Sequence, residues 1–226
     1  MNGKSLHIPS CPASGRGPGR PPEMAECERR EKILSAAGEV LRTHGYQAAS
    51  MDKVAQCSGM SKRTLYQLFP SKQELFHALI GARLFRLSLS VRENAGTPTE
   101  ELIALLSDMA AHLTRPDTVE LIRAIIASAP EAEDIRHIMS TLTQCGETNI
   151  LKAWLQKYCC DRGLCHENTE EKSRQLFGMT VGDLMLDALI SRNLEPDAVR
   201  SFITSGARLF LAALEAERNQ EGRETA

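Results

Sequence analysis

The chain has 226 residues, of which 42% are hydrophobic and 4% aromatic, and its formal net charge is −2. This length accommodates one or two domains with a buried core. The absence of any apolar run of 18 residues, and of an apolar signal core in the first 30, excludes a transmembrane helix or secretory leader from the expected organisation. Frequent Leu, Ala, Glu and Arg favour an all-α fold.

The small net charge conceals an uneven distribution. Residues 1–92 contain 14 Lys and Arg against 7 Asp and Glu, whereas residues 93–226 contain 13 against 22. A basic half of this kind suits contact with nucleic acid. The 7 cysteines are odd in number and follow no signal peptide, so we expect reduced thiols and a cytoplasmic location.

Residues 1–24 are rich in Gly, Pro and Ser and lack hydrophobic periodicity, which predicts a disordered basic arm. Two interpretations of this arm remain open. It is either a flexible tail or an arm that enters a narrow minor groove through Arg16 and Arg20, which are spaced by glycine and proline.

Apolar residues at helical spacing predict a first helix from about Cys27 to His44, ended by Gly45. Ser50 and Ser61 are expected to cap two short helices that meet at Gly59. Two short helices at a steep angle form a helix-turn-helix, in which the second helix lies in the major groove of DNA. The residues expected to contact bases or phosphates are Ser50, Ser61, Lys62, Arg63, Thr64, Tyr66 and Gln67.

Pro70 is expected to end the second short helix, and Ser71 and Glu74 form a capping box that begins a fourth. The predicted organisation is a helix-turn-helix DNA-binding domain at 25–75, a linking helix at about 72–94, a ligand-binding and dimerisation domain at 95–218, and a tail at 219–226.

An extended set of residues carries a family resemblance: Ile33-Leu34-x-Ala36-Ala37, His44-Gly45-Tyr46, Ser50-Met51, Val54-Ala55, Gly59-Met60-Ser61-Lys62, Thr64-Leu65-Tyr66 and Phe69-Pro70-Ser71-Lys72-x-Glu74-Leu75-Phe76. Together they resemble the signature of the TetR family of transcriptional repressors. The segment from Glu120 to Pro130 is similar to the AefR-like subgroup of that family's ligand domains. Arg63 departs from the pattern, because a small residue is common there.

The resemblance implies an all-helical homodimer that binds operator DNA and is controlled by a small molecule. It also implies that Lys62, Thr64 and Gln67 read bases, that Ser50, Tyr66 and Lys72 hold phosphates, and that the linking helix swings when the ligand binds.

The second half contains helical patterns at about 99–113, 116–129, 131–161, 169–190 and 196–216. The last two have apolar residues on more than one side, which indicates either internal core or a two-fold four-helix interface between protomers. The residues expected at this interface are Val181, Met185, Leu189, Phe202, Leu209 and Phe210.

We expect a ligand cavity among the middle helices, with apolar walls and a few polar groups. The residues expected to line it are Met109, His112, Arg123, His137, Asn149, Trp154, Tyr158 and Phe177. Cys159, Cys160 and Cys165 suggest an alternative, a redox- or metal-responsive switch, although their spacing fits no common zinc site and ordinary core or loop cysteines are the simpler interpretation.

No paired carboxylates, nucleophile motif or phosphate-binding loop indicates an enzyme, and no cofactor or bound metal is expected. The sequence therefore predicts a DNA-binding transcriptional regulator, a repressor that occupies a palindromic operator as a homodimer and is released by a small-molecule inducer. An architectural DNA-binding protein without an effector is the remaining alternative.

Overall fold

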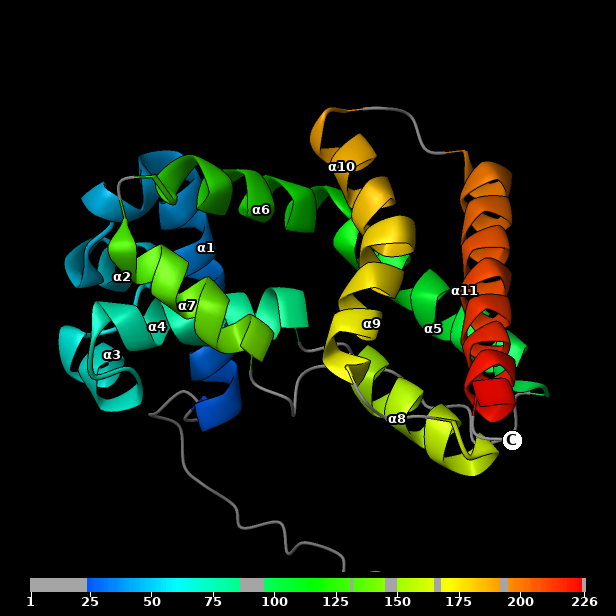
Figure 1. The fold of residues 1–226 in the computed structure, drawn as a ribbon. Helices are drawn as coiled ribbons and strands as arrows, with labels where there is room; N and C mark the ends of the chain where they lie inside the picture. The colour runs from blue at the N-terminus through cyan, green and yellow to red at the C-terminus, as the bar shows by residue number, and fades with distance from the viewer. Residues whose placement is uncertain are drawn as a thin grey trace, which may run out of the picture.

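The structure is a computed structural model that describes residues 24–85, 96–130, 132–144, 150–164, 168–191 and 195–224. All regular structure in these ranges is helical, which confirms the predicted all-α fold (Figure 1). The N-terminal elements are α1 (Glu26–Ala48), α2 (Met51–Ser58), α3 (Lys62–Leu68), α4 (Lys72–Ile80) and the π-helical turn η1 (Gly81–Phe85).

The remaining elements form the C-terminal half. They are α5 (Pro98–Leu113), α6 (Pro116–Ser128), α7 (Glu133–Gln144), α8 (Ile150–Arg162), α9 (Thr169–Phe177), the π-helical turn η3 (Gly178–Gly182), α10 (Asp183–Leu189) and α11 (Pro196–Glu224). Figure 1 shows α2 and α3 at the end of the molecule remote from α11.

The predicted helix boundaries around the helix-turn-helix are confirmed by local geometry. Gly45 has φ 70° and ψ 169°, which interrupts the helical path of α1, and Gly59 ends α2 with φ 66°. Glycine adopts this left-handed conformation without the steric cost of a Cβ atom. The hydroxyl oxygens of Ser50, Ser61 and Ser71 accept hydrogen bonds from the first-turn amides of α2, α3 and α4, at 3.1–3.2 Å.

The prediction of one helix across 131–161 is wrong. The structure has two helices there: α7 packs against α4, and α8 packs against α9 (Figure 1). The sequence between them includes Gly146, Thr148 and Asn149, residues of weak helix propensity that a count of apolar residues over a long window does not take into account. The predicted linking helix is described as far as Phe85, and the rest of its range lies outside the described residues.

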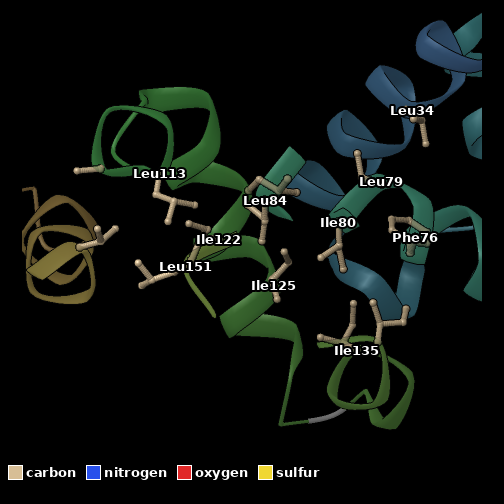
Figure 2. Close-up of a cluster of buried hydrophobic side chains, with 14 of the residues drawn as sticks. Leu34, Phe76, Leu79, Ile80, Leu84, Leu113, Ile122, Ile125, Ile135 and Leu151 are labelled. Atoms are coloured by element: carbon tan, nitrogen blue, oxygen red, sulfur yellow. The ribbon is translucent and has the colours of Figure 1, made fainter. Parts of the chain in front are cut away.

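The two halves share one hydrophobic core. Figure 2 shows Phe76, Leu79 and Ile80 of α4 in the same cluster as Ile125 of α6 and Ile135 of α7. Ile80 and Ile135 are both 0% exposed. Burial of such a side chain stabilises the fold by about 1.5–3 kcal/mol. The packing of α6 and α7 on the N-terminal helices therefore fixes the helix-turn-helix relative to the C-terminal half.

Candidate nucleic-acid interface

The helix-turn-helix is held by a small set of apolar side chains. Val54 of α2 and Leu65 of α3 are both 0% exposed, and Phe69, directly after α3, is 2% exposed. Helix α2 packs on α1 and on α3. Because Leu65 is fully buried and Leu68 is partly buried against the same core, the side chains on the opposite side of this short helix face outward.

The outward face of α3 carries hydrogen-bonding groups. Lys62, Arg63, Tyr66 and Gln67 are exposed, and the Tyr66 side chain is 49% exposed despite its size. Thr64 is partly covered, and its hydroxyl lies 2.9 Å from that of Ser61. The predicted reading residues therefore lie together on one exposed surface, with side chains of the types that hydrogen-bond base edges and phosphates.

Lys62 has a second partner within the protein. Its Nζ lies 2.8 Å from Oδ1 of Asp52, which belongs to the first turn of α2. The hydrogen bond to Asp52 raises the pKa of the Lys62 ammonium. No sequence pattern predicts this ion pair, because the two residues are on different helices and only the angle between those helices brings them together.

Lys72 lies against the end of α1, whereas the residues predicted to read bases lie on the exposed face of α3. Its Nζ donates to the main-chain carbonyl of Tyr46 at 2.6 Å and lies 4.1 Å from the centroid of the Tyr46 ring. Partial burial lowers the pKa of Lys72. Lys72 therefore braces the start of α4 against the end of α1, a structural role that is additional to the predicted phosphate contact.

Tyr46 also joins the helix-turn-helix to the C-terminal half. Its main-chain amide donates to Ser128 Oγ at 3.2 Å, and its hydroxyl donates to Asp134 at 2.9 Å. Gln73, at the start of α4, donates to the other Asp134 oxygen. We call Tyr46, Gln73, Ser128 and Asp134 the interdomain joint. Separations of 82 and 88 residues along the chain carry no periodic signal, so sequence patterns did not reveal it.

Arg123, predicted to line a ligand cavity, is engaged elsewhere. Its guanidinium donates to the carbonyl of Leu189 at 2.8 Å and to Ser191 Oγ at 2.9 Å. These contacts satisfy carbonyl groups at the C-terminus of α10, where a cation is favourable. His112 is similarly engaged, because its Nε2 lies 2.6 Å from the carbonyl oxygen of Arg83 in η1.

The other predicted cavity residues are dispersed. Trp154 and Tyr158 are brought together as a stacked pair with ring centroids 5.1 Å apart. Met109 and Phe177 are partly buried, His137 is exposed, and Asn149 lies outside the described residues. An open hollow of about 630 Å³ runs along the start of α9, and residues other than the predicted ones line it: Asn168, Glu170, Glu171, Arg174 and Gln175.

The predicted interface residues divide into two groups. Val181 and Phe210 are 0% and 8% exposed within the protomer, so they belong to its own core and do not support the predicted interface. Met185 and Leu189 are partly buried, whereas Phe202 and Leu209 are exposed. The structure adds three exposed apolar residues that were not expected at the interface. These five exposed residues, here called the apolar face, are Met179, Leu186, Ile190, Phe202 and Leu209.

The buried side of the chain can be followed from α9 through η3 (Gly178–Gly182) into α10. Ser173, Leu176, Val181 and Leu184 are buried at ordinary helical spacing, whereas Leu186 and Ile190 are exposed. The sequence left internal core and a protomer interface open for these helices, and Val181 belongs to the internal core.

The remaining predictions concern the arm and the cysteines. Arg16, Arg20 and Cys165 lie outside the described residues. Cys159 is buried and Cys160 is exposed. Within the described ranges, no cluster of three or more His, Cys, Asp or Glu side chains is arranged to hold a metal ion.

None of the helices in those ranges combines the length and apolar character needed to cross a bilayer.

Comparison with known proteins gives two adjacent family matches. Residues 33–79 match the profile of bacterial regulatory proteins of the tetR family, and residues 100–216 match that of the AefR-like transcriptional repressor C-terminal domain. The second match alone covers more than half of the chain.

Curated relatives match over part of the chain. The HTH-type transcriptional activator FasR of Mycolicibacterium smegmatis is 40% identical over 89 residues, which are 39% of this chain and 40% of FasR. The HTH-type transcriptional repressor KstR of the same organism is 30% identical over 120 residues, 50% of this chain and 59% of KstR. The chain thus spans about half the length of these relatives.

Solved structures match over most of the chain. The flavonoid-responsive regulator FrrA has a TM-score of 0.65 and 26% identity, with 82% of this chain and 96% of FrrA covered. A putative transcriptional regulator from Pseudomonas aeruginosa PAO1 has a TM-score of 0.67 and 19% identity, with 85% and 95% covered. The helix-turn-helix with an exposed polar face, the all-helical architecture and the two family matches lead to one conclusion: the chain belongs to the TetR family of DNA-binding transcriptional regulators and has an AefR-like C-terminal domain.

Proposed function

We propose that this regulator is a repressor that binds a two-fold symmetric operator as a homodimer and leaves it when a small molecule binds the C-terminal half. The observation that carries the proposal is the outward face of α3. Lys62, Arg63 and Gln67 are all exposed there, on a helix fixed from behind by the fully buried Leu65. Lys and Arg pair with guanine and Gln with adenine in the major groove.

The apolar face supports assembly of two copies. Leu186 of α10 and Leu209 of α11 are 56% and 64% exposed, and Ile190 is 67% exposed. Large apolar side chains exposed to water are costly and are typical of an interface. A self-complementary contact through this face generates two-fold symmetry. Two α3 helices related by that axis would read half-sites about 34–36 Å apart, or one helical turn.

The interdomain joint supports control of DNA binding by a ligand. Asp134 of α7 and Ser128 of α6 contact Tyr46, which lies near the end of α1, shortly before α2 begins. A ligand that displaces α6 or α7 therefore acts on the element that precedes the helix-turn-helix. The name of FrrA records a response to flavonoids, which supports an organic small molecule as the class of effector for this chain.

The family match supports repression as the direction of control. The profile that covers residues 100–216 is that of a transcriptional repressor. KstR is a repressor and FasR an activator, so a direct assay is required. Transcription in vitro from a promoter that contains the selected operator is expected to fall when the protein is added. An increase would contradict repression while leaving DNA binding intact.

The proposal is tested with duplexes selected by the wild-type protein from a random library. We expect a symmetric sequence to be enriched and to bind much more tightly than an unrelated duplex of the same length. Addition of small aromatic compounds, beginning with flavonoids, is expected to release the duplex. Failure to enrich any sequence would contradict operator recognition, and enrichment of a single, unrepeated half-site would contradict the dimer.

A further inference from the structure

The DNA-facing segment contains a single carboxylate. Between residues 50 and 73, the basic residues are Lys53, Lys62, Arg63 and Lys72, and the acidic residue is Asp52 alone. A negative charge close to the phosphate backbone opposes binding to any DNA sequence, because like charges repel. Asp52 therefore requires a reason beyond general affinity.

The structure pairs this carboxylate with a reading residue. Lys62 Nζ lies 2.8 Å from Asp52 Oδ1, and the two side chains are 64% and 63% exposed. Burial does not force the contact, and an exposed pair of this kind contributes little to folding stability. The pair does, however, place the ammonium of Lys62, the first residue of α3, beside Asp52.

A lysine ammonium has three donors, so it can keep one hydrogen bond to a carboxylate while it donates to acceptors on a base. A phosphate that lies out of reach of this position attracts the ammonium away from Asp52. That move would leave Asp52 unpaired beside the DNA backbone. The ion pair therefore penalises attachment to phosphate more than contact with a correctly placed base.

We propose that Asp52 is a specificity-determining residue, which positions Lys62 for base contact and weakens binding to non-operator DNA. The inference rests on the proposed function, in which α3 reads base edges. The inference goes beyond the proposed function because it assigns discrimination between operator and non-operator DNA to a residue of α2 that need not touch a base. Asp52 acts through Lys62 and is a positioning residue.

The test uses the full-length protein, the duplex selected by the wild type and an unrelated duplex of equal length. Asp52→Asn removes the charge with almost no change in shape. Affinity for the unrelated duplex is expected to rise about tenfold and affinity for the selected duplex by less, so the ratio of the two falls. Because Lys62 becomes free to displace a counterion from DNA, the slope of log K against log salt is expected to steepen by about 0.9.

A double-mutant cycle separates positioning from a general charge effect. In a Lys62→Ala background, Asp52→Asn is expected to change the ratio of affinities much less than it does in the wild type. Asp161→Asn removes one negative charge at the exposed end of α8 and serves as the matched control. It is expected to leave both the ratio and the salt slope unchanged.

An alternative role for Asp52 is to stabilise the N-terminus of α2, where an acidic side chain interacts favourably with the helix dipole. That role predicts a lower melting temperature for Asp52→Asn with an unchanged ratio of affinities, a result that overturns the proposal. An equal effect with and without Lys62 also overturns it. If the wild-type protein selects no duplex, the proposed function itself fails, and the inference fails with it.

Discussion

The hydroxyl of Tyr46 donates a hydrogen bond of 2.9 Å to the carboxylate of Asp134, and so ties the end of α1 to α7 across the boundary between the two halves. Tyr46 is 2% exposed, and its ring lies edge-on to Phe76 at 5.1 Å between centroids. The position of the helix-turn-helix is thus set by polar contacts as well as by the shared core.

Tyr46→Phe tests the energetic value of this contact. The substitution removes the hydroxyl and retains the ring, so Asp134 loses one partly buried donor and keeps Gln73. We expect the free energy of unfolding, measured with urea, to fall by about 1 kcal/mol. Tyr158→Phe is the matched control, because its hydroxyl makes a longer contact of 3.4 Å to Glu215. An equal or larger loss in the control would contradict the importance of the joint.

The same tyrosine predicts a dependence of stability on alkaline pH. Burial, together with Asp134, raises the pKa of Tyr46 far above its ordinary value of 10.0. The folded protein therefore keeps the phenolic proton at a pH where the unfolded chain releases it. The stability that Tyr46 confers is complete below about pH 10 and is lost progressively above it, by up to about 1.4 kcal/mol per pH unit.

The Tyr46→Phe variant lacks the phenolic proton, so its stability provides the reference for the wild type. The stability advantage of the wild type over Tyr46→Phe is expected to narrow between pH 9 and pH 11 in urea unfolding curves. A constant difference over that range would show that the pKa of Tyr46 is the same in the folded and unfolded states.

Lys72→Ala is expected to affect DNA binding and stability together. The substitution removes a phosphate-binding candidate and also the 2.6 Å hydrogen bond to the Tyr46 carbonyl. Affinity should fall for every duplex, with the magnitude of the salt slope reduced by about one, and the melting temperature should fall by several degrees. Lys157→Ala, at an exposed position of α8, controls for the loss of one positive charge. An unchanged salt slope would limit Lys72 to its structural role.

Leu209→Glu tests the apolar face. Leu209 is 64% exposed, and a charge there would be buried without a partner in the proposed dimer, which is strongly unfavourable. Sedimentation equilibrium is expected to show a monomer, and binding to the symmetric operator should weaken. Ile126→Glu is the matched control, because Ile126 is an exposed apolar residue of α6, outside the apolar face. A dimeric Leu209→Glu variant would contradict this interface.

The elements with strong local signals could be predicted from the sequence. Ser50, Gly59 and Ser61 mark helix ends by their own side-chain and backbone chemistry, and the structure places each where expected. These features define the helix-turn-helix and the exposed face of α3.

Features that depend on tertiary packing were not predictable from local pattern. The helices over 169–190 have apolar residues on more than one side, and only their packing in the fold decides that Val181 is buried and Leu186 exposed. Arg123 resembled a cavity residue because it is a lone cation in an apolar stretch. In the structure it caps α10, which lies 66 residues away in sequence. The fold decides which residue such a side chain contacts, so the sequence around Arg123 does not predict its partner.

The most direct test of the central claim, that α3 reads base edges, compares the sequences selected from a random duplex library by the wild type and by Gln67→Ala. Gln67 is exposed on α3 and is not needed for its packing. We expect the variant to fold normally and to lose preference at one or two symmetry-related positions of the operator, at a cost of about 1–3 kcal/mol per base contact. An unchanged preference at every position, with unchanged affinity, would contradict the assignment of α3 as the reading helix.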